Sequence, residues 1–332
     1  MGARRSINLI AWDNKVGLSS DLRLLADALA ECGHAVHFST LGRGKLRKWT
    51  RPLRRRLAWL WTRLRGQGRF DANLMLEHIR PEDFPFARCN LFLPNPEWCS
   101  PDDIERLPRV NGVLLKTMHA EMLFRGLGCR TAHIGFSSAD RLDASVPREQ
   151  TFFHLAGRSP HKGTERLLAL WRKHPEWPRL TVVQNPRSAR PAPPAGNIVH
   201  RIDYLSDAEL KRLQNANAFH LCCSETEGFG HYIVEGMSVA AVVLTTDAPP
   251  MNELVTSERG VLVGYDETGR QQLATTYRFS EGALETAVER CLVMSDAERA
   301  EMGRRARGWF ERNHAEFPRR LHAALEAMLA SA

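Results

Sequence analysis

Short apolar runs alternate with longer amphipathic stretches along this chain. In the first half, apolar runs typical of buried parallel strands occur at 6–12, 35–38, 72–76, 90–93 and 111–117. The second half repeats the scheme at 151–156, 179–184, 197–200, 219–223, 242–246 and 260–263. Apolar residues three or four apart between these runs predict helices, such as one from Ser19 or Ser20 to Gly33. Strand and helix in alternation predict an α/β fold with parallel sheets.

A chain of 332 residues is long for one core and suits two α/β domains. The stretch from Leu142 to Gln150 is polar, contains Pro147 and has the character of a linker. We therefore predict an N-terminal domain at 1–145, a C-terminal domain at 146–312, and a terminal helical segment at 313–332. The segments 281–312 and 317–329 are amphipathic and predict two helices.

Composition narrows the class of protein. No apolar run reaches about 18 residues, so no membrane-spanning helix is expected. The N-terminus leads directly into the first predicted strand, which leaves no room for the apolar region of a signal peptide. Seven scattered cysteines without a Cys-x2-Cys pair favour a reducing cytoplasm and no structural zinc. The expected location is therefore the cytoplasm.

The positive charge is concentrated in one segment. Residues 45–69 contain ten Lys and Arg and no acidic residue, and without these ten charges the net charge of +8 becomes −2. Trp and Leu recur there at helical spacing, and Pro52 is expected near a helix start or a kink. Such a helix suits an anionic membrane surface, where the protein would be peripheral on the inner face of the cytoplasmic membrane. The alternative is a core-packed helix with a solvated charged face. No aromatic and basic module surrounds the segment, so we expect no nucleic-acid partner.

Several candidate ligand-binding residues lie in Ser224–Gly236, between a predicted apolar strand and a predicted helix. The glycines Gly228 and Gly230 allow a sharp turn, and helical periodicity is expected from Phe229. A helix that begins after a strand offers N–H groups and a positive dipole end to an anion such as a diphosphate. Glu227 and Glu235 bracket seven residues and can accept hydrogen bonds from sugar hydroxyls.

Polar residues in the first half follow predicted strands. Asn95 and Glu97 come after one strand, and Lys116 and His119 come after the next. The carboxyl ends of parallel strands meet at one edge, where α/β sheets bind ligands. We therefore expect these four residues to cluster there, as contacts of a substrate or as structural polar groups.

Glu-x7-Glu after an apolar strand and a serine resembles the retaining GT-B glycosyltransferases of family 4 type. Gly157-Arg158 with Lys162-Gly163, placed between a strand and a helix, resembles the diphosphate clamp of that family. The resemblance covers about 150–265 well and 6–140 loosely. It departs at the first βα loop, where only Gly17 is present, and at 184–186, where Gln-Asn-Pro replaces Gly-x-Gly.

The resemblance implies a GT-B fold, two doubly wound Rossmann-like domains with a deep cleft between them. It implies that a sugar moves from a nucleotide diphosphate to an acceptor hydroxyl with retention, the acceptor being a glycan or lipid-linked glycan in cell-envelope polysaccharide synthesis. The implied donor-binding residues are Gly17, Arg158, Lys162, Phe229, Gly230 and Glu235. Glu227 would orient the sugar and His119 would lie near the reacting sugar, both as catalytic residues, and Asn95, Glu97 and Lys116 would bind the acceptor. No Asp-x-Asp stands at a strand end, so neither a metal nor another cofactor is expected.

Two alternatives stay open. One is an inverting GT-B transferase with Glu97 or Asp13 as the base. The other is a non-catalytic sugar- or membrane-binding protein on a degenerate GT-B fold.

Overall fold

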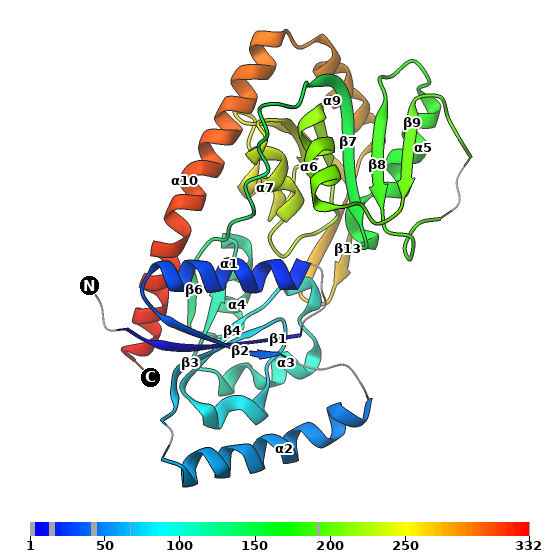
Figure 1. Ribbon diagram of the computed structural model, residues 1–332. Helices are drawn as coiled ribbons and strands as arrows, with labels where there is room; N and C mark the ends of the chain where they lie inside the picture. Colours follow the sequence, from blue (N-terminus) through cyan, green and yellow to red (C-terminus); the bar gives the residue numbers. More distant parts are fainter. Residues whose placement is uncertain (1–3, 13–16, 41–44, 67, 191–192, 332) are drawn as a thin grey trace. The chain divides into compact units, whose positions relative to one another are not determined.

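The computed structural model describes residues 4–12, 17–40, 45–66, 68–190 and 193–331. Internal contacts divide the chain into two compact units (Figure 1). The first unit contains residues 1–136 and 315–332, and the second contains residues 137–314.

The first unit is built on a six-stranded sheet in which every pair of strands is parallel. The strands follow the order β2-β1-β3-β4-β5-β6. Their bounds are β1 Ser6–Ala11, β2 Ala35–Thr40, β3 Phe70–Leu76, β4 Ala87–Leu93, β5 Gly112–Leu115 and β6 Thr131–His133. The central strands are almost wholly buried, as expected for a sheet covered on both faces.

The helices of the first unit are α1 Gly17–Glu31, α2 Lys45–Leu64, α3 Pro101–Arg106 and α4 Met118–Gly126, with 3-10 turns η1 Pro81–Phe86, η2 Pro96–Trp98 and η3 Leu107–Arg109. Helix α3 begins with a capping box between Ser100 and Asp103, because each side chain accepts a hydrogen bond from the other residue's backbone N–H. Helix α2 has Pro52 inside it, rather than at its start.

The second unit repeats this architecture. Its parallel sheet has the order β12-β11-β10-β7-β8-β9. The strands are β7 Glu149–Gly157, β8 Leu180–Gln184, β9 Ile198–Ile202, β10 Asn217–Cys222, β11 Val242–Thr246 and β12 Val261–Val263. The side chains of Phe152, Trp171 and Phe219 are fully buried and pack ring against ring at the centre of this core.

Helices and one hairpin complete the second unit. They are η4 Pro160–Lys162, α5 Thr164–Lys173, α6 Asp207–Ala216, α7 His231–Ser238, α8 Met251–Leu254, α9 Glu281–Val293 and the antiparallel strands β13 Tyr265–Gln271 and β14 Ala274–Phe279. Helix α10, Asp296–Leu329, is continuous, so the two helices predicted after residue 281 end and begin at other places than expected. Its residues up to 314 belong to the second unit and those from 315 to the first.

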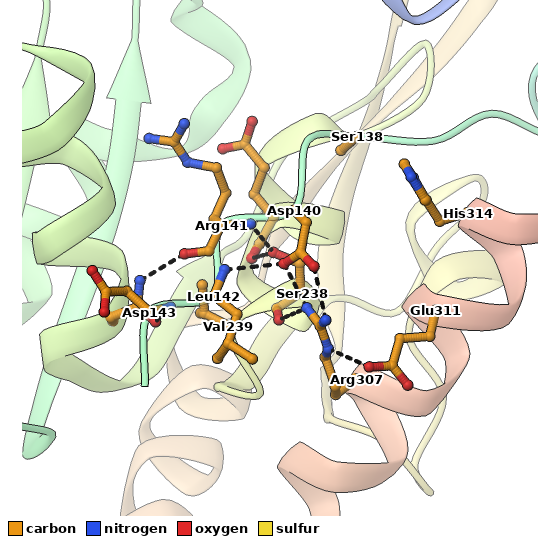
Figure 2. A network of polar contacts seen from close by, with 12 residues as sticks. Ser138, Asp140, Arg141, Leu142, Asp143, Ser238, Val239, Arg307, Glu311 and His314 are labelled. Atoms are coloured by element: carbon orange, nitrogen blue, oxygen red, sulfur yellow. Dashed lines mark hydrogen bonds and ion pairs between the residues drawn. The ribbon is translucent and has the colours of Figure 1, made fainter. Parts of the chain in front are cut away.

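A network of hydrogen bonds and ion pairs connects the segment at 137–143 to the rest of the second unit (Figure 2). The guanidinium of Arg307 on α10 donates to both carboxylate oxygens of Asp140, at 2.5 and 2.8 Å, and to the backbone carbonyl of Ser238 at 2.6 Å. The hydrogen bonds from Arg307 lower the pKa of Asp140. Arg141 donates its backbone N–H to the Ser238 hydroxyl. Because of these contacts, residues 137–145, which the sequence prediction assigned to the N-terminal domain, group with the second unit.

Candidate functional site

The order of the second sheet has a switch point between β7 and β10. From β7 the chain adds β8 and β9 on one side, and then β10, β11 and β12 on the other. In open α/β sheets, ligands bind outside the carboxyl ends of the strands at such a point. The two loops that leave this point, 158–163 after β7 and 223–230 after β10, contain five of the residues singled out from the sequence.

Lys162 and Glu227 meet across these two loops. The Lys162 ammonium donates to Glu227 Oε1 at 2.6 Å and lies 3.4 Å from the centre of the Tyr232 ring. Both charged side chains are mostly buried, with 15% and 14% exposed. The Ser224 hydroxyl lies 2.5 Å from the same Glu227 oxygen and 2.5 Å from the Tyr232 hydroxyl. The switch point therefore has a cation and a carboxylate fixed by a buried hydroxyl pair.

The backbone of Glu225 joins the 223–230 loop to its neighbours on both sides. Its N–H donates to the carbonyl of His161 at 2.8 Å, and its carbonyl accepts from the N–H of Tyr277 on β14 at 2.7 Å. A Cβ on Gly163, whose φ is +69°, would lie 2.9 Å from the Cys223 carbonyl oxygen. Glycine is therefore required there, because the two loops approach too closely for a side chain.

Glu235 lies in α7 and is held by a chain of polar contacts. The buried Gln214 donates its amide to Glu235 Oε2 at 2.8 Å and accepts from Arg141 Nε at 2.8 Å. Arg141 in turn donates to a carboxylate oxygen of Asp207 at 2.7 Å. One carboxylate oxygen of Glu235 is therefore oriented from within the unit.

The other donor-side residues are positioned by the start of α7. Gly230 is the N-cap of this helix with φ +102°, so the helix begins at His231 and not at Phe229, as the periodicity had suggested. Phe229 is buried and packs edge-on against His231, whose ring accepts from or donates to the Ser138 hydroxyl at 2.8 Å. Arg158 is exposed and forms no ion pair or hydrogen bond within the described part of the chain.

Three titratable groups behind the site are neutral core residues. Burial lowers the pKa of His154 and of His220 to about 4. The ring nitrogens of His154 are bonded to the Leu221 carbonyl and the Thr164 hydroxyl. Burial also raises the pKa of the Cys222 thiol far above its usual value, and this thiol is close enough to sense the charges of Lys162, Glu227 and Glu235.

In the first unit the structure brings Asn95 and Lys116 together. The Lys116 ammonium donates to Asp21 Oδ2 at 2.5 Å and to Asn95 Oδ1 at 3.0 Å, and it lies 4.7 Å from the centre of the Phe136 ring. The Lys116 and Asp21 side chains are almost fully buried. These contacts are of the structural kind, so a role of Lys116 in acceptor binding stays a prediction.

Glu77 joins this cluster at the end of β3. Its carboxylate is 3.5 Å from Asn95 Nδ2, and its backbone has φ +62°, which is uncommon for a residue with a side chain. Burial raises the pKa of Glu77. Glu97 is buried in η2, and His119 is half-buried in the first turn of α4, which Thr117 caps.

Two sequence predictions concern the loop after β1. Gly17 is the first residue of α1. Asp13, the candidate base of the inverting alternative, lies outside the described residues.

One group of side chains in the described ranges has the spacing of a metal site. It consists of His34, His322 and Glu326 in the first unit. Arg5 occupies the Glu326 carboxylate with two hydrogen bonds, at 2.9 and 2.8 Å, and the two histidines are bonded to each other at 2.9 Å. His34 directly precedes β2, so the group lies at the amino end of this strand, whereas Asn95 and Lys116 follow the carboxyl ends of β4 and β5. An arginine on the carboxylate makes these residues a poor fit for a cation.

Three site residues were missed from the sequence: Asp21, Glu77 and Gln214. Asp21 and Gln214 are each one of several polar residues in their helices, and their partners Lys116 and Glu235 are 95 and 21 residues away in sequence. Glu77 directly follows an apolar strand, which is the same signal that identified Asn95.

No family model matches this sequence, and no curated protein matches it. Solved structures do match in fold. A glycosyltransferase from Rickettsia africae has a TM-score of 0.70 at 12% identity, covering 99% of this chain and 100% of that one. Anabaena HepE in complex with UDP-glucose has a TM-score of 0.70 at 14% identity, covering 98% and 100%. The catalytic domain of Arabidopsis thaliana starch synthase IV, bound to ADP and acarbose, has a TM-score of 0.69 at 11% identity, covering 98% and 100%.

Two doubly wound parallel sheets and these structural matches agree over almost the whole chain. The α/β fold expected from the sequence is therefore confirmed: this chain has the GT-B fold.

Proposed function

We propose that this protein is a nucleotide-sugar-dependent glycosyltransferase of the hexosyltransferase type. The observation that carries the proposal is the meeting of Lys162 and Glu227, at 2.6 Å, at the switch point of the second sheet. A cation there suits a diphosphate, and a carboxylate beside it suits sugar hydroxyls. Solved structures of the same fold hold UDP-glucose or ADP, which supports a nucleotide-sugar donor.

The proposed donor site uses residues of both loops. Arg158 and Lys162 hold the diphosphate, assisted by the N-terminal end of α7 after Phe229 and Gly230. Glu235 binds the ribose hydroxyls. Paired cations stabilise the negative charge that develops on the leaving phosphate.

In the proposed reaction the bond from the anomeric carbon to the phosphate oxygen breaks, and a bond to the acceptor oxygen forms with retention. The acceptor proton passes to the leaving phosphate, so no strong enzymatic base is needed. Glu227 orients the sugar. His119, as a catalytic residue, and Gly17, as a donor-binding residue, stay predictions from the family resemblance.

The proposed acceptor is a glycan or lipid-linked glycan of cell-envelope polysaccharide synthesis, bound by Asn95, Glu97 and Lys116. The proposed location is the cytoplasm, with a peripheral position on the inner face of the cytoplasmic membrane. No helix in the described residues is long and apolar enough to cross a membrane. We propose that no metal is required, and full activity in the presence of a chelator would agree with this.

Calorimetric titration with UDP-, GDP- and ADP-sugars tests the proposal. Binding of one of them, weakened in Lys162→Ala, is expected. The absence of binding to every nucleotide sugar would favour a non-catalytic protein. If a product forms, its anomeric configuration separates retention from inversion, the alternative in which Glu97 or Asp13 would be the base.

A further inference from the structure

Helix α2 has its apolar face turned away from the unit that it belongs to. Leu53, Leu57, Leu60 and Leu64 are spaced three or four apart, and with Trp61 they form one stripe along the helix. We call these five residues the α2 stripe. Their exposed fractions lie between 44% and 83%, whereas an amphipathic helix of a globular protein normally buries such a face.

The opposite side of α2 is attached to the unit by arginines. Arg51 forms ion pairs with Glu82, at 2.9 Å, and with Asp83, and Arg55 pairs with Asp83 at 2.5 Å. The Asp83 side chain is fully buried in η1. Arg55 also lies 3.8 Å from the centre of the Phe86 ring. Because these ion pairs and the ring contact hold the arginine side against the unit, the α2 stripe faces outward.

The charge on both sides of the α2 stripe determines which kind of surface it can bind. Arg54, Arg56 and Arg63 are exposed and adjoin the stripe, and residues 45–69 contain no acidic residue. Two copies of this chain joined through α2 would bring the exposed Arg54, Arg56 and Arg63 of each copy close together, and this repulsion opposes a dimer there. An exposed apolar stripe flanked by arginines, with a tryptophan, matches the interface of an anionic bilayer.

We propose that α2 is a membrane-docking helix that lies in the plane of an anionic lipid surface. In this position the α2 stripe enters the boundary between headgroups and acyl chains, and the flanking arginines contact lipid phosphates. Arg51 and Arg55 remain on Glu82 and Asp83 and fix the helix to its unit. The proposal does not depend on transferase activity. If the acceptor is lipid-linked, docking would concentrate the protein where that acceptor is found.

The test is co-sedimentation of the full-length protein with vesicles of phosphatidylcholine alone or mixed with phosphatidylglycerol. Wild type is expected to sediment with the anionic vesicles and to remain largely in solution with the neutral ones. Leu57→Gln/Leu60→Gln and, separately, Arg54→Gln/Arg56→Gln should each weaken the partition coefficient about tenfold or more. Val293→Gln is the matched control, since Val293 is 82% exposed in another helix, and it should sediment as wild type does.

Thermal melts of every variant show whether it is folded, and nucleotide-sugar titration shows separately whether the donor site is intact. Wild type that stays in solution with anionic vesicles would overturn the proposal. It would also be overturned if the leucine variant sedimented as wild type does while the arginine variant did not, because the surface would then bind polyanions without entering lipid. Quenching of tryptophan fluorescence by brominated lipid should be reduced in Trp61→Phe, and unchanged quenching would contradict insertion of the stripe.

Discussion

Replacement of Lys162 by methionine separates a structural role of this lysine from a role in donor binding. Lys162→Met keeps most of the side-chain volume but removes the ammonium that donates to Glu227 at 2.6 Å and faces the Tyr232 ring. Glu227 then keeps the Ser224 hydroxyl as a partner. Removing one member of a buried ion pair costs about 3–5 kcal/mol. Because both side chains retain some exposure, we expect a loss of about 3 kcal/mol in the free energy of unfolding.

The effect on donor binding has a different origin. A charge-assisted hydrogen bond to phosphate contributes about 2 kcal/mol, so the dissociation constant of the nucleotide sugar should rise roughly thirtyfold. In the double variant Lys162→Met/Glu227→Gln no carboxylate is left without its cation. Stability should therefore recover in large part, while donor affinity stays low.

Urea denaturation gives the free energies of unfolding, and calorimetric titration gives the affinities. The matched control is Lys173→Met, because Lys173 pairs with Glu281 through side chains that are 58% and 38% exposed. It should cost less than about 1 kcal/mol and leave donor affinity unchanged. If Lys162→Met binds the donor as tightly as wild type, the assignment of Lys162 to the diphosphate is refuted, whatever happens to stability.

Three further predictions concern the second unit. Gln214→Ala leaves Glu235 without its amide partner, and KM for the donor should rise about tenfold; an unchanged KM would show that the orientation of Glu235 is irrelevant. Burial lowers the pKa of His220 from about 6.5 to about 4, so between these values the unfolded chain binds a proton that the folded chain does not. The contribution of His220 to the free energy of unfolding should therefore be full above about pH 6.5 and fall by about 3 kcal/mol toward pH 4, and His154, with the same pKa, adds a similar fall. His220→Gln should remove one proton from this pH dependence, as measured by denaturation at several pH values, and an unaltered slope would contradict it. Arg307→Ala should cost about 1 kcal/mol, allowing for solvent screening, whereas the control Arg305→Ala, an exposed pair on the same helix, should melt as wild type does.

Structural features that depend on neighbouring residues in the chain could be predicted from the sequence. Strand β11 has the bounds that its apolar run predicts, Val242–Thr246, because a buried parallel strand is apolar throughout. The capping box of α3 between Ser100 and Asp103 is local in the same sense, because both partners lie within one turn. These elements, in their order, predict an α/β fold with parallel sheets, and the GT-B fold was implied by the motif resemblance at 150–265.

Features that depend on distant partners were not predictable in this way. The hairpin β13–β14 was missed, because its first strand is almost wholly exposed and lacks an apolar pattern. The sequence prediction ended one helix at 312 and began the next at 317, whereas α10 continues through Asn313–Glu316 without a break. Lys162, Glu227 and Glu235 were selected for their types and spacing, but their partners Tyr232, Ser224 and Gln214 depend on the tertiary fold.

The two backbone hydrogen bonds of Glu225 have a consequence for how ligand selectivity can change by substitution. They join the strand-end loop on one side to the loop after β7 and on the other to the β13–β14 hairpin. Any ligand that docks at this edge meets main chain that is already ordered, so little conformational entropy is lost on association. Substitutions in the solvent-facing hairpin can therefore shift the loop by fractions of an ångström and retune selectivity while every side chain that contacts the ligand stays the same.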